Sequence, residues 1–294
     1  MTDPRFPLLA MPVGISISES SDMEELGFGE PHLRDFLTEV ARYLLAAGAS
    51  LAYGGDLRSG GYTETLFSLV NNYKIPGGGT TPRIRSYLAW PIHLLLDVKA
   101  RATLQRSAEI HALPAPELPD IDPQTFLPPK DTASSYVWCR SLTAMRRRLA
   151  RDNAAQVLMG GRTAGYKGKY PGLVEEAYEC MRAGIPVFLI GAFGGATRDV
   201  ILALTGQHPE SLTEAAQTAH ASYRALLPHY NAQIPADEPP INYDQLVQFF
   251  RERGIAGLNN GLSEAENFRM FTSPHLVEIV SLLLKGLKRG YAKN

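Results

Sequence analysis

The chain has 294 residues, and its 29 lysines and arginines nearly balance its 30 aspartates and glutamates, for a formal net charge of -1. That balance argues against nucleic-acid binding, which usually shows as a strongly basic domain or stripe. With 45% hydrophobic and 20% charged residues, the composition excludes a disordered chain and suffices for a large core.

The N-terminal stretch and the apolar runs argue against export and membrane insertion. Residues 1–14 lack the basic region and the long apolar region of a signal peptide. No uninterrupted apolar stretch approaches the ~20 residues that a spanning helix needs. Cys139 and Cys180 have no metal-ligand spacing, which is typical of reduced thiols. We therefore expect a cytoplasmic protein without a metal, a cofactor, or a nucleic-acid or membrane partner.

The first third of the chain alternates between strand and helix patterns. A buried strand is expected at 12–17 and a helix at 31–47, after a polar loop. A second strand is expected at 49–55, a helix at 62–72 after a glycine loop, and a third strand at 84–90. The expected helix at 31–47 has apolar residues at three- and four-residue steps: Leu33, Phe36, Leu37, Val40 and Leu44.

The pattern weakens after the third strand and then resumes. Residues 113–130 contain six prolines, which preclude a helix or a central strand there. Beyond them, the sequence predicts a helix at 136–151, a strand at 154–161, a helix at 172–184 and a strand at 185–195. Strands that alternate with helices predict an α/β, Rossmann-like parallel sheet with helices on both faces.

Helical patterns dominate after Gly206. Helices are expected at 211–227, 243–253 and 274–287. We predict a Rossmann-like nucleotide-binding domain over 1–206 and a C-terminal helical extension over 207–294 that packs on it. These helices either cap the sheet or build an oligomer surface, and the sequence does not separate the two.

Four of the expected strands are followed by loops of unusual composition, and this is the main functional signal. In an open parallel sheet, ligands bind outside the carboxyl ends of the strands, where such loops converge. The first loop offers hydroxyl groups, although serine-rich turns also serve their own backbone. The second has two Gly-Gly pairs before a helix start, which favours an anion such as phosphate. Candidate ligand-binding residues in these two loops are Gly14, Ser16, Ser18, Gly54, Gly55, Asp56, Arg58, Gly60, Gly61 and Thr63.

The third and fourth loops follow the strands at 154–161 and 185–195. The third is long, glycine-rich and basic, and Glu175 and Glu176 stand at the start of the helix after it. These carboxylates either complement the helix dipole or bind a ribose hydroxyl or act in catalysis. The fourth resembles a second phosphate cradle, although packing glycines would look similar. Candidate residues here are Gly160, Gly161, Arg162, Lys167, Lys169, Pro171, Gly172, Glu176, Gly194, Gly195 and Thr197.

The segment from Ala154 to Glu176 resembles the SLOG superfamily. A strand that ends in Gly-Gly leads to a proline–glycine–x–x–Glu–Glu helix start. The superfamily includes the LOG, or lysine decarboxylase-like, phosphoribohydrolases, whose signature is P-G-G-x-G-T-x-x-E. The "GGDLRSGGYTE" and "FLIGAFGGATR" segments look more like the nucleotide-sensing branch, found in bacterial conflict systems and in divergent form in TRPM channels. The resemblance covers about 12–206.

The resemblance implies two functions. Carried over to this sequence, the catalytic glutamate of the LOG enzymes falls on Glu176, with Glu175 one position away, and their arginine falls near Arg146. Leu173 stands where the signature has threonine, which favours ligand binding over hydrolysis. The first hypothesis is a sensor of an ADP-ribose-like or cyclic nucleotide in a bacterial defence or signalling system. The second is a nucleotide N-glycosidase that cleaves the base from a nucleoside 5'-monophosphate or an NAD-related nucleotide. A homo-oligomer and an effector partner are also expected.

Overall fold

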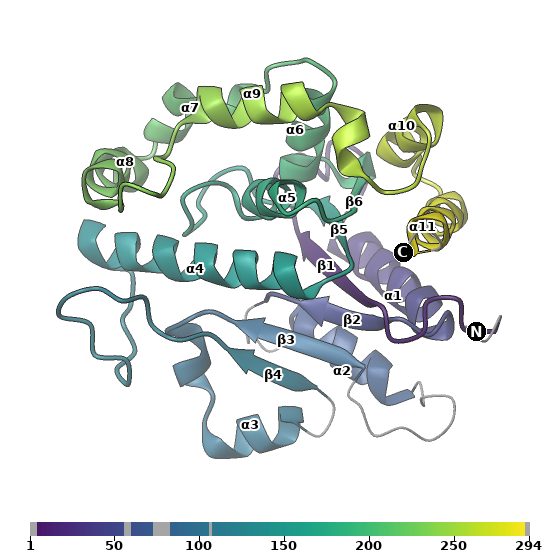
Figure 1. Ribbon diagram of the computed structural model, residues 1–294, viewed down its shortest axis with the longest axis horizontal. Helices are drawn as coiled ribbons and strands as arrows, with labels where there is room; N and C mark the ends of the chain where they lie inside the picture. Colours follow the sequence, from purple (N-terminus) through teal and green to yellow (C-terminus); the bar gives the residue numbers. More distant parts are fainter. Residues whose placement is uncertain (1–4, 56–59, 73–82, 106–107, 292–294) are drawn as a thin grey trace.

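The computed structural model describes residues 5–55, 60–72, 83–105 and 108–291. Within them, six strands form one parallel sheet in the order β4-β3-β2-β1-β5-β6 (Figure 1). The strand order reverses between β1 and β5, where the chain returns from one edge of the sheet to its middle. The strands are β1 (Pro12–Ser18), β2 (Ser50–Tyr53), β3 (Ile84–Leu88), β4 (Glu109–Ala112), β5 (Ala155–Gly160) and β6 (Val187–Ile190).

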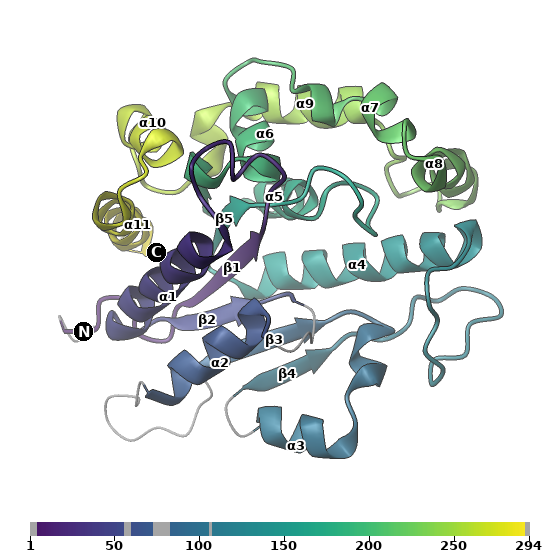
Figure 2. The same ribbon diagram turned by 180° about the vertical axis from the view of Figure 1, so that it is seen from behind.

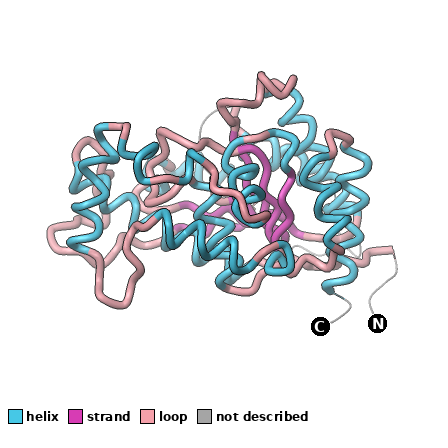
Figure 3. The backbone as a smooth tube through the Cα atoms, turned by 90° about the horizontal axis from the view of Figure 1, so that it is seen from above, coloured by secondary structure: helices cyan, strands magenta, loops and turns pink. Residues whose placement is uncertain are grey.

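Helices cover both faces of this sheet. Helices α1 and α2 lie on one face, and α4 and α5 lie on the other (Figures 1 and 2). Viewed from above, the strands are enclosed between helices (Figure 3). The expected Rossmann-like α/β architecture is therefore confirmed. The helices up to Gly206 are α1 (Glu30–Ala46), α2 (Tyr62–Asn72), α3 (Val98–Gln105), α4 (Thr132–Asp152), α5 (Gly172–Arg182) and α6 (Gly195–Leu204).

The remaining helices add outer layers to this core. Helix α8 packs on α4, α9 on α6, α10 against β6 and α11 beside α1. No helix in the described parts of the chain is both long and apolar enough to cross a membrane. The proposed domain boundary at residue 206 stays a prediction. These helices are α7 (Glu214–Thr218), α8 (Ala221–Gln233), α9 (Tyr243–Arg253), α10 (Glu264–Thr272) and α11 (Leu276–Tyr291).

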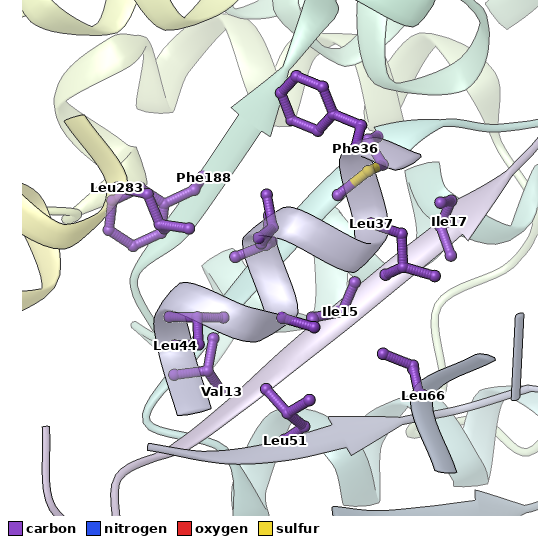
Figure 4. Close-up of a cluster of buried hydrophobic side chains, with 14 of the residues drawn as sticks. Val13, Ile15, Ile17, Phe36, Leu37, Leu44, Leu51, Leu66, Phe188 and Leu283 are labelled. Atoms are coloured by element: carbon purple, nitrogen blue, oxygen red, sulfur yellow. The ribbon is translucent and has the colours of Figure 1, made fainter. Parts of the chain in front are cut away.

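Strand β1 is apolar on one face and polar on the other, as the two-residue period of a strand requires. Val13, Ile15 and Ile17 are buried towards α1, where they pack with Leu37 and Leu44 (Figure 4). Ser16, between them, points to the other face, where it contacts Gln156 of β5 and Glu176 of α5. A Cβ at Gly14 would overlap the amide ends of Gln156 and Asn153, so a larger residue there would displace these side chains. This alternation places the polar face of β1 against β5 and α5.

One predicted helix is wrong, and three elements were not predicted. The expected helix at 211–227 is divided, because α7 ends at Thr218 and α8 begins at Ala221. The Gln217 amide donates to the backbone oxygens of Thr163 and Ser211, at 2.8 and 2.6 Å, so tertiary contacts override the helical pattern. Strand β4 and helices α3 and α10 were not predicted. Strand β4 is a short edge strand with exposed and half-buried residues, and it lacks a buried apolar run.

Candidate functional site

A buried polar cluster lies where the strand order reverses, between β1 and β5. The Ser16 hydroxyl on β1 donates a hydrogen bond to the carboxylate of Glu176 on α5. The Gln156 amide on β5 donates to Ser16 Oγ at 2.6 Å, and Asn153 Nδ2 donates to Gln156 Oε1 at 3.1 Å. We call Ser16, Arg146, Gln156, Glu175 and Glu176 the switch-point cluster. In open parallel sheets this reversal is where ligands bind.

The two neighbouring glutamates have different partners. Glu175 is fully buried and accepts hydrogen bonds from Thr143 Oγ1 and Arg146 Nη1, both on α4. Glu176 instead reaches Ser16 on β1, and its Oε1 is 3.7 Å from Arg146 Nε. The structure thus places Glu175 in an ion pair between two helices and Glu176 at the switch point. Sequence reasoning did not distinguish these positions.

Burial raises the pKa of the Glu176 carboxyl group above its usual value of 4.5, and the nearby Glu175 carboxylate adds to this rise. The positive charge of Arg146 and the hydrogen bond from Ser16 oppose it without cancelling it. A carboxyl group whose protonated form is favoured in a buried site is able to serve as a hydrogen-bond or proton donor.

The third predicted loop passes over Arg146. We call residues 161–171, between β5 and α5, the basic loop. A Cβ at Gly168 would stand 2.6 Å from Arg146 Nη1, and one at Gly172 would stand 3.1 Å from Arg146 Nη2. These two glycines therefore permit the backbone to approach the guanidinium. Pro171 is the N-cap of α5 and fixes where the helix begins.

The predicted basic residues of this loop do not converge on the cluster. Lys169 is fully buried, and its ammonium group lies 3.8 Å from Glu179 Oε1 without a hydrogen-bond partner among the described residues. Lys167 is exposed, and its ammonium group lies 4.5 Å from the centre of the Trp138 ring. Arg162 is also exposed.

Glycines pack closely where β5 ends and α6 begins. A Cβ at Gly161 would stand 2.9 Å from Ala196 Cβ, and one at Gly160 would overlap the backbone oxygen of Ser18. Gly161 N donates to Ser18 O at 2.7 Å, and Ala196 N donates to Gly161 O at 2.9 Å. All four predicted glycines at this junction have a positive φ: Gly160, Gly161, Gly194 and Gly195. Their geometry is that of close packing between the basic loop and α6.

The start of α6, predicted as a second phosphate cradle, carries one of the chain's own carboxylates. Asp22 Oδ1 accepts a hydrogen bond from Gly195 N at 2.9 Å. The helix dipole favours a negative charge at this position. Thr197, in the first turn, is fully buried, and its hydroxyl lacks a hydrogen-bond partner in the described part of the chain.

The second predicted loop is described only in part. Asp56 and Arg58 lie outside the described residues. A Cβ at Gly54 would stand 3.0 Å from Leu149 Cδ1 on α4, and one at Gly55 would overlap the Tyr53 ring. Gly60 N donates to Glu64 Oε2 at 2.7 Å, and Glu64 N donates to Gly61 O at 3.1 Å. Thr63 is buried in the first turn of α2.

Sequence reasoning missed three polar residues that complete the site. Gln156 interrupts an otherwise apolar strand pattern, and that interruption was a usable signal. Thr143 and Asp22 gave none, because a threonine in a polar helix and an aspartate in a serine-rich loop are ordinary. The structure brings Ser16, Glu175, Glu176 and the sequence-predicted Arg146 together. Ser18, whose backbone oxygen binds Gly161, contributes to the glycine junction.

Comparison with known proteins identifies a family. A family model described as SLOG cluster2 matches residues 7–270. The match extends past Gly206 through α7, α8 and α9 and into α10, so these helices are part of what the family model describes. No curated protein matches the chain.

Replacing Gly161 by alanine is expected to destabilise the protein more than the same change at Gly165. Both have a positive φ, but a Cβ added at Gly165 would meet no atom of the described residues within 4 Å, whereas one added at Gly161 would meet Ala196 and Leu173. Gly165→Ala should cost about 1–2 kcal/mol through backbone strain, and Gly161→Ala about 1–3 kcal/mol more through overpacking. Urea denaturation measures both, and equal losses would refute a packing role for Gly161.

Glu176→Gln is expected to stabilise the protein at neutral pH. Because folding raises the pKa of Glu176, the native state holds its proton over a range in which the unfolded state has lost it. Wild-type stability therefore falls as pH rises from about 4.5 towards the folded pKa. Glutamine removes this loss, so the difference in the free energy of unfolding should grow with pH and vanish below about pH 4. Glu25→Gln, at an exposed position, is the control. A difference that stays constant from pH 4 to 8 would contradict the assignment.

Proposed function

Because the chain belongs to the SLOG cluster2 family, we propose that it binds a nucleotide-derived ligand at the switch point between β1 and β5. Membership of this family fits nucleotide-related binding or processing. The observation that carries the proposal is the contact between Ser16 and Glu176, which places a carboxyl group and a hydroxyl group at the reversal of strand order.

The proposed ligand is an ADP-ribose-like or cyclic nucleotide second messenger. Glu176 would hold a ribose hydroxyl, since carboxyl oxygens accept hydrogen bonds from sugar hydroxyls. Arg146 would neutralise charge on the ligand from beneath the basic loop. A role in a bacterial defence or signalling system is part of the same proposal.

Ligand entry requires the basic loop to move. The side chains of Arg146 and Glu176 are each 7% exposed, so the described state is closed over the switch-point cluster. The loop is hydrogen-bonded to the C-terminal helices: Tyr166 Oη donates to Gln217 Oε1 at 3.0 Å, and Asn242 N donates to Tyr170 Oη at 2.9 Å. Opening the loop would break these bonds, and α7–α9 would thereby report occupancy.

The raised pKa of Glu176 favours a second candidate, a nucleotide N-glycosidase or phosphoribohydrolase. A buried carboxyl group that keeps its proton is able to donate it to a departing base, as the acid carboxyl does in glycoside cleavage. Arg146 would grip the phosphate. Glu175 is committed to Arg146 and Thr143, so it would support the site rather than take part in the reaction.

Glu176→Ala is expected to weaken nucleotide binding about tenfold, the loss that follows from about 1.4 kcal/mol of hydrogen-bond energy. Titration calorimetry with AMP, ADP-ribose, NAD and cyclic nucleotides measures it, with Glu25→Ala as the control at an exposed carboxylate. Absence of binding to every nucleotide at millimolar concentration would overturn the proposal.

Chromatography of the same mixtures separates a sensor from an enzyme. Release of free base by the wild type, abolished in Glu176→Gln while binding persists, identifies the glycosidase. Intact nucleotide after prolonged incubation identifies the sensor.

We also propose that the C-terminal helices mediate a homo-oligomer or contact an effector protein. Exposed apolar side chains on α10 and α11 support this: Phe268 is 43% exposed and Val277 79% exposed. Light scattering should then give a mass above the 32.2 kDa of one chain, or a mass that changes with ligand. A single-chain mass in both conditions would count against an oligomer.

A further inference from the structure

A cavity lies at the tip of the basic loop, where the loop faces the first turns of α4 and α8. We call it the loop-tip cavity. Its walls include Ser135 of α4, Tyr166 and Lys167 of the loop, and His220, Ser222 and Tyr223 at the start of α8. The residues of the switch-point cluster are not among its walls. The two sites therefore use different parts of the same loop.

The described residues that line this cavity include basic side chains but no acidic ones. No aspartate or glutamate is among the described residues that line it, whereas Lys167 and His220 are. The Lys167 ammonium group is held over the Trp138 ring at 4.5 Å, which restrains a side chain that is otherwise free in solvent. Ser135 and Ser222 add hydroxyl groups that are able to donate to an anion. This chemistry fits a phosphate group with polar substituents.

The size of the cavity limits what it holds. Its volume is about 230 Å³, below the range of roughly 300–1,000 Å³ that is typical of sites for drug-sized ligands. A phosphate group with an attached sugar fits that space better than a complete dinucleotide. We propose that the loop-tip cavity binds a phosphate monoester, in which Lys167 and His220 contact the phosphate. This proposal does not depend on binding at the switch point.

Hydrogen bonds connect the cavity walls to the rest of the loop and to α9. Tyr166 Oη lies 2.6 Å from Tyr243 Oη, which lies 2.8 Å from Tyr223 Oη. Tyr223 Oη in turn donates to the backbone oxygen of Lys169. Cys139 Sγ donates to the Lys167 backbone oxygen at 3.4 Å. Hydrogen bonds to α4, α8 and α9 therefore hold the loop around Lys167. This favours a single geometry for an occupant that contacts Lys167.

The test is calorimetric titration of the full chain with ribose 5-phosphate, with ribose as the ligand lacking phosphate. We expect ribose 5-phosphate to bind and ribose not to. Lys167→Gln should weaken ribose 5-phosphate binding about tenfold, the size of one charge-assisted hydrogen bond. The control Lys288→Gln removes another exposed charge, from α11, and should change the affinity less than about twofold. His220→Gln is a second variant at an exposed position and should also weaken binding.

The results identify the occupant and separate the two proposals. Failure of ribose 5-phosphate to bind the wild type, or equal affinity in Lys167→Gln and the wild type, overturns the loop-tip site. In either case, nucleotide binding that depends on Glu176 would still support the switch-point site. Binding of ribose 5-phosphate that depends on Lys167 and not on Glu176 supports a free phosphate ester. AMP binding that weakens in both Lys167→Gln and Glu176→Ala supports a nucleotide that reaches both sites.

Discussion

The ion pair between Arg146 and Glu175 joins α4 to α5 beneath the basic loop, and the arrangement of the site depends on it. Both side chains are almost completely removed from water, which is costly for charged groups unless their hydrogen bonds are also made. Thr143 supplies one of those bonds, and Gly168 and Gly172 let the loop backbone cover the guanidinium. Arg146 is hydrogen-bonded to Glu175 and lies 3.7 Å from Glu176, which accepts a hydrogen bond from Ser16 of β1. The two adjacent glutamates in the first turns of α5 thus have different partners.

The features that follow from periodicity were predictable from the sequence. The apolar residues of β1 alternate, and those of α1 recur every three or four residues. These two apolar faces pack against each other in the core, so the sequence pattern predicted both elements. The proximity of the segments that follow β1 and β5 also followed from the parallel order of the strands. What the pattern did not contain is the direction of individual side chains. The choice between Glu175 and Glu176 depends on α4, more than twenty residues away in sequence.

The function of the glycine-rich loops was also not predictable from the sequence pattern alone. Gly-Gly pairs after two strands predicted anion cradles, but at the β5–α6 junction the glycines serve close contact between backbones. A cradle and a packing junction have the same sequence signature, because both require a missing Cβ and a positive φ. Likewise, Lys167 and Lys169 are two residues apart, yet one is exposed over Trp138 and the other is buried near Glu179. Only tertiary packing separates their roles.

Asp22 affects which anions are able to bind at the N-terminal end of α6. Its carboxylate is bound to the first amide of α6, and the chain that carries it is anchored in β1 only a few residues away. A group tethered by so short a segment is present at its binding position with an effective concentration on the order of millimolar or more. Any external anion at that helix end competes with this internal one. At equal intrinsic affinity, a free anion below that concentration occupies the helix end less than Asp22 does. This end of α6 is thus held by a group of the chain itself, and an external anion reaches it only in competition with Asp22.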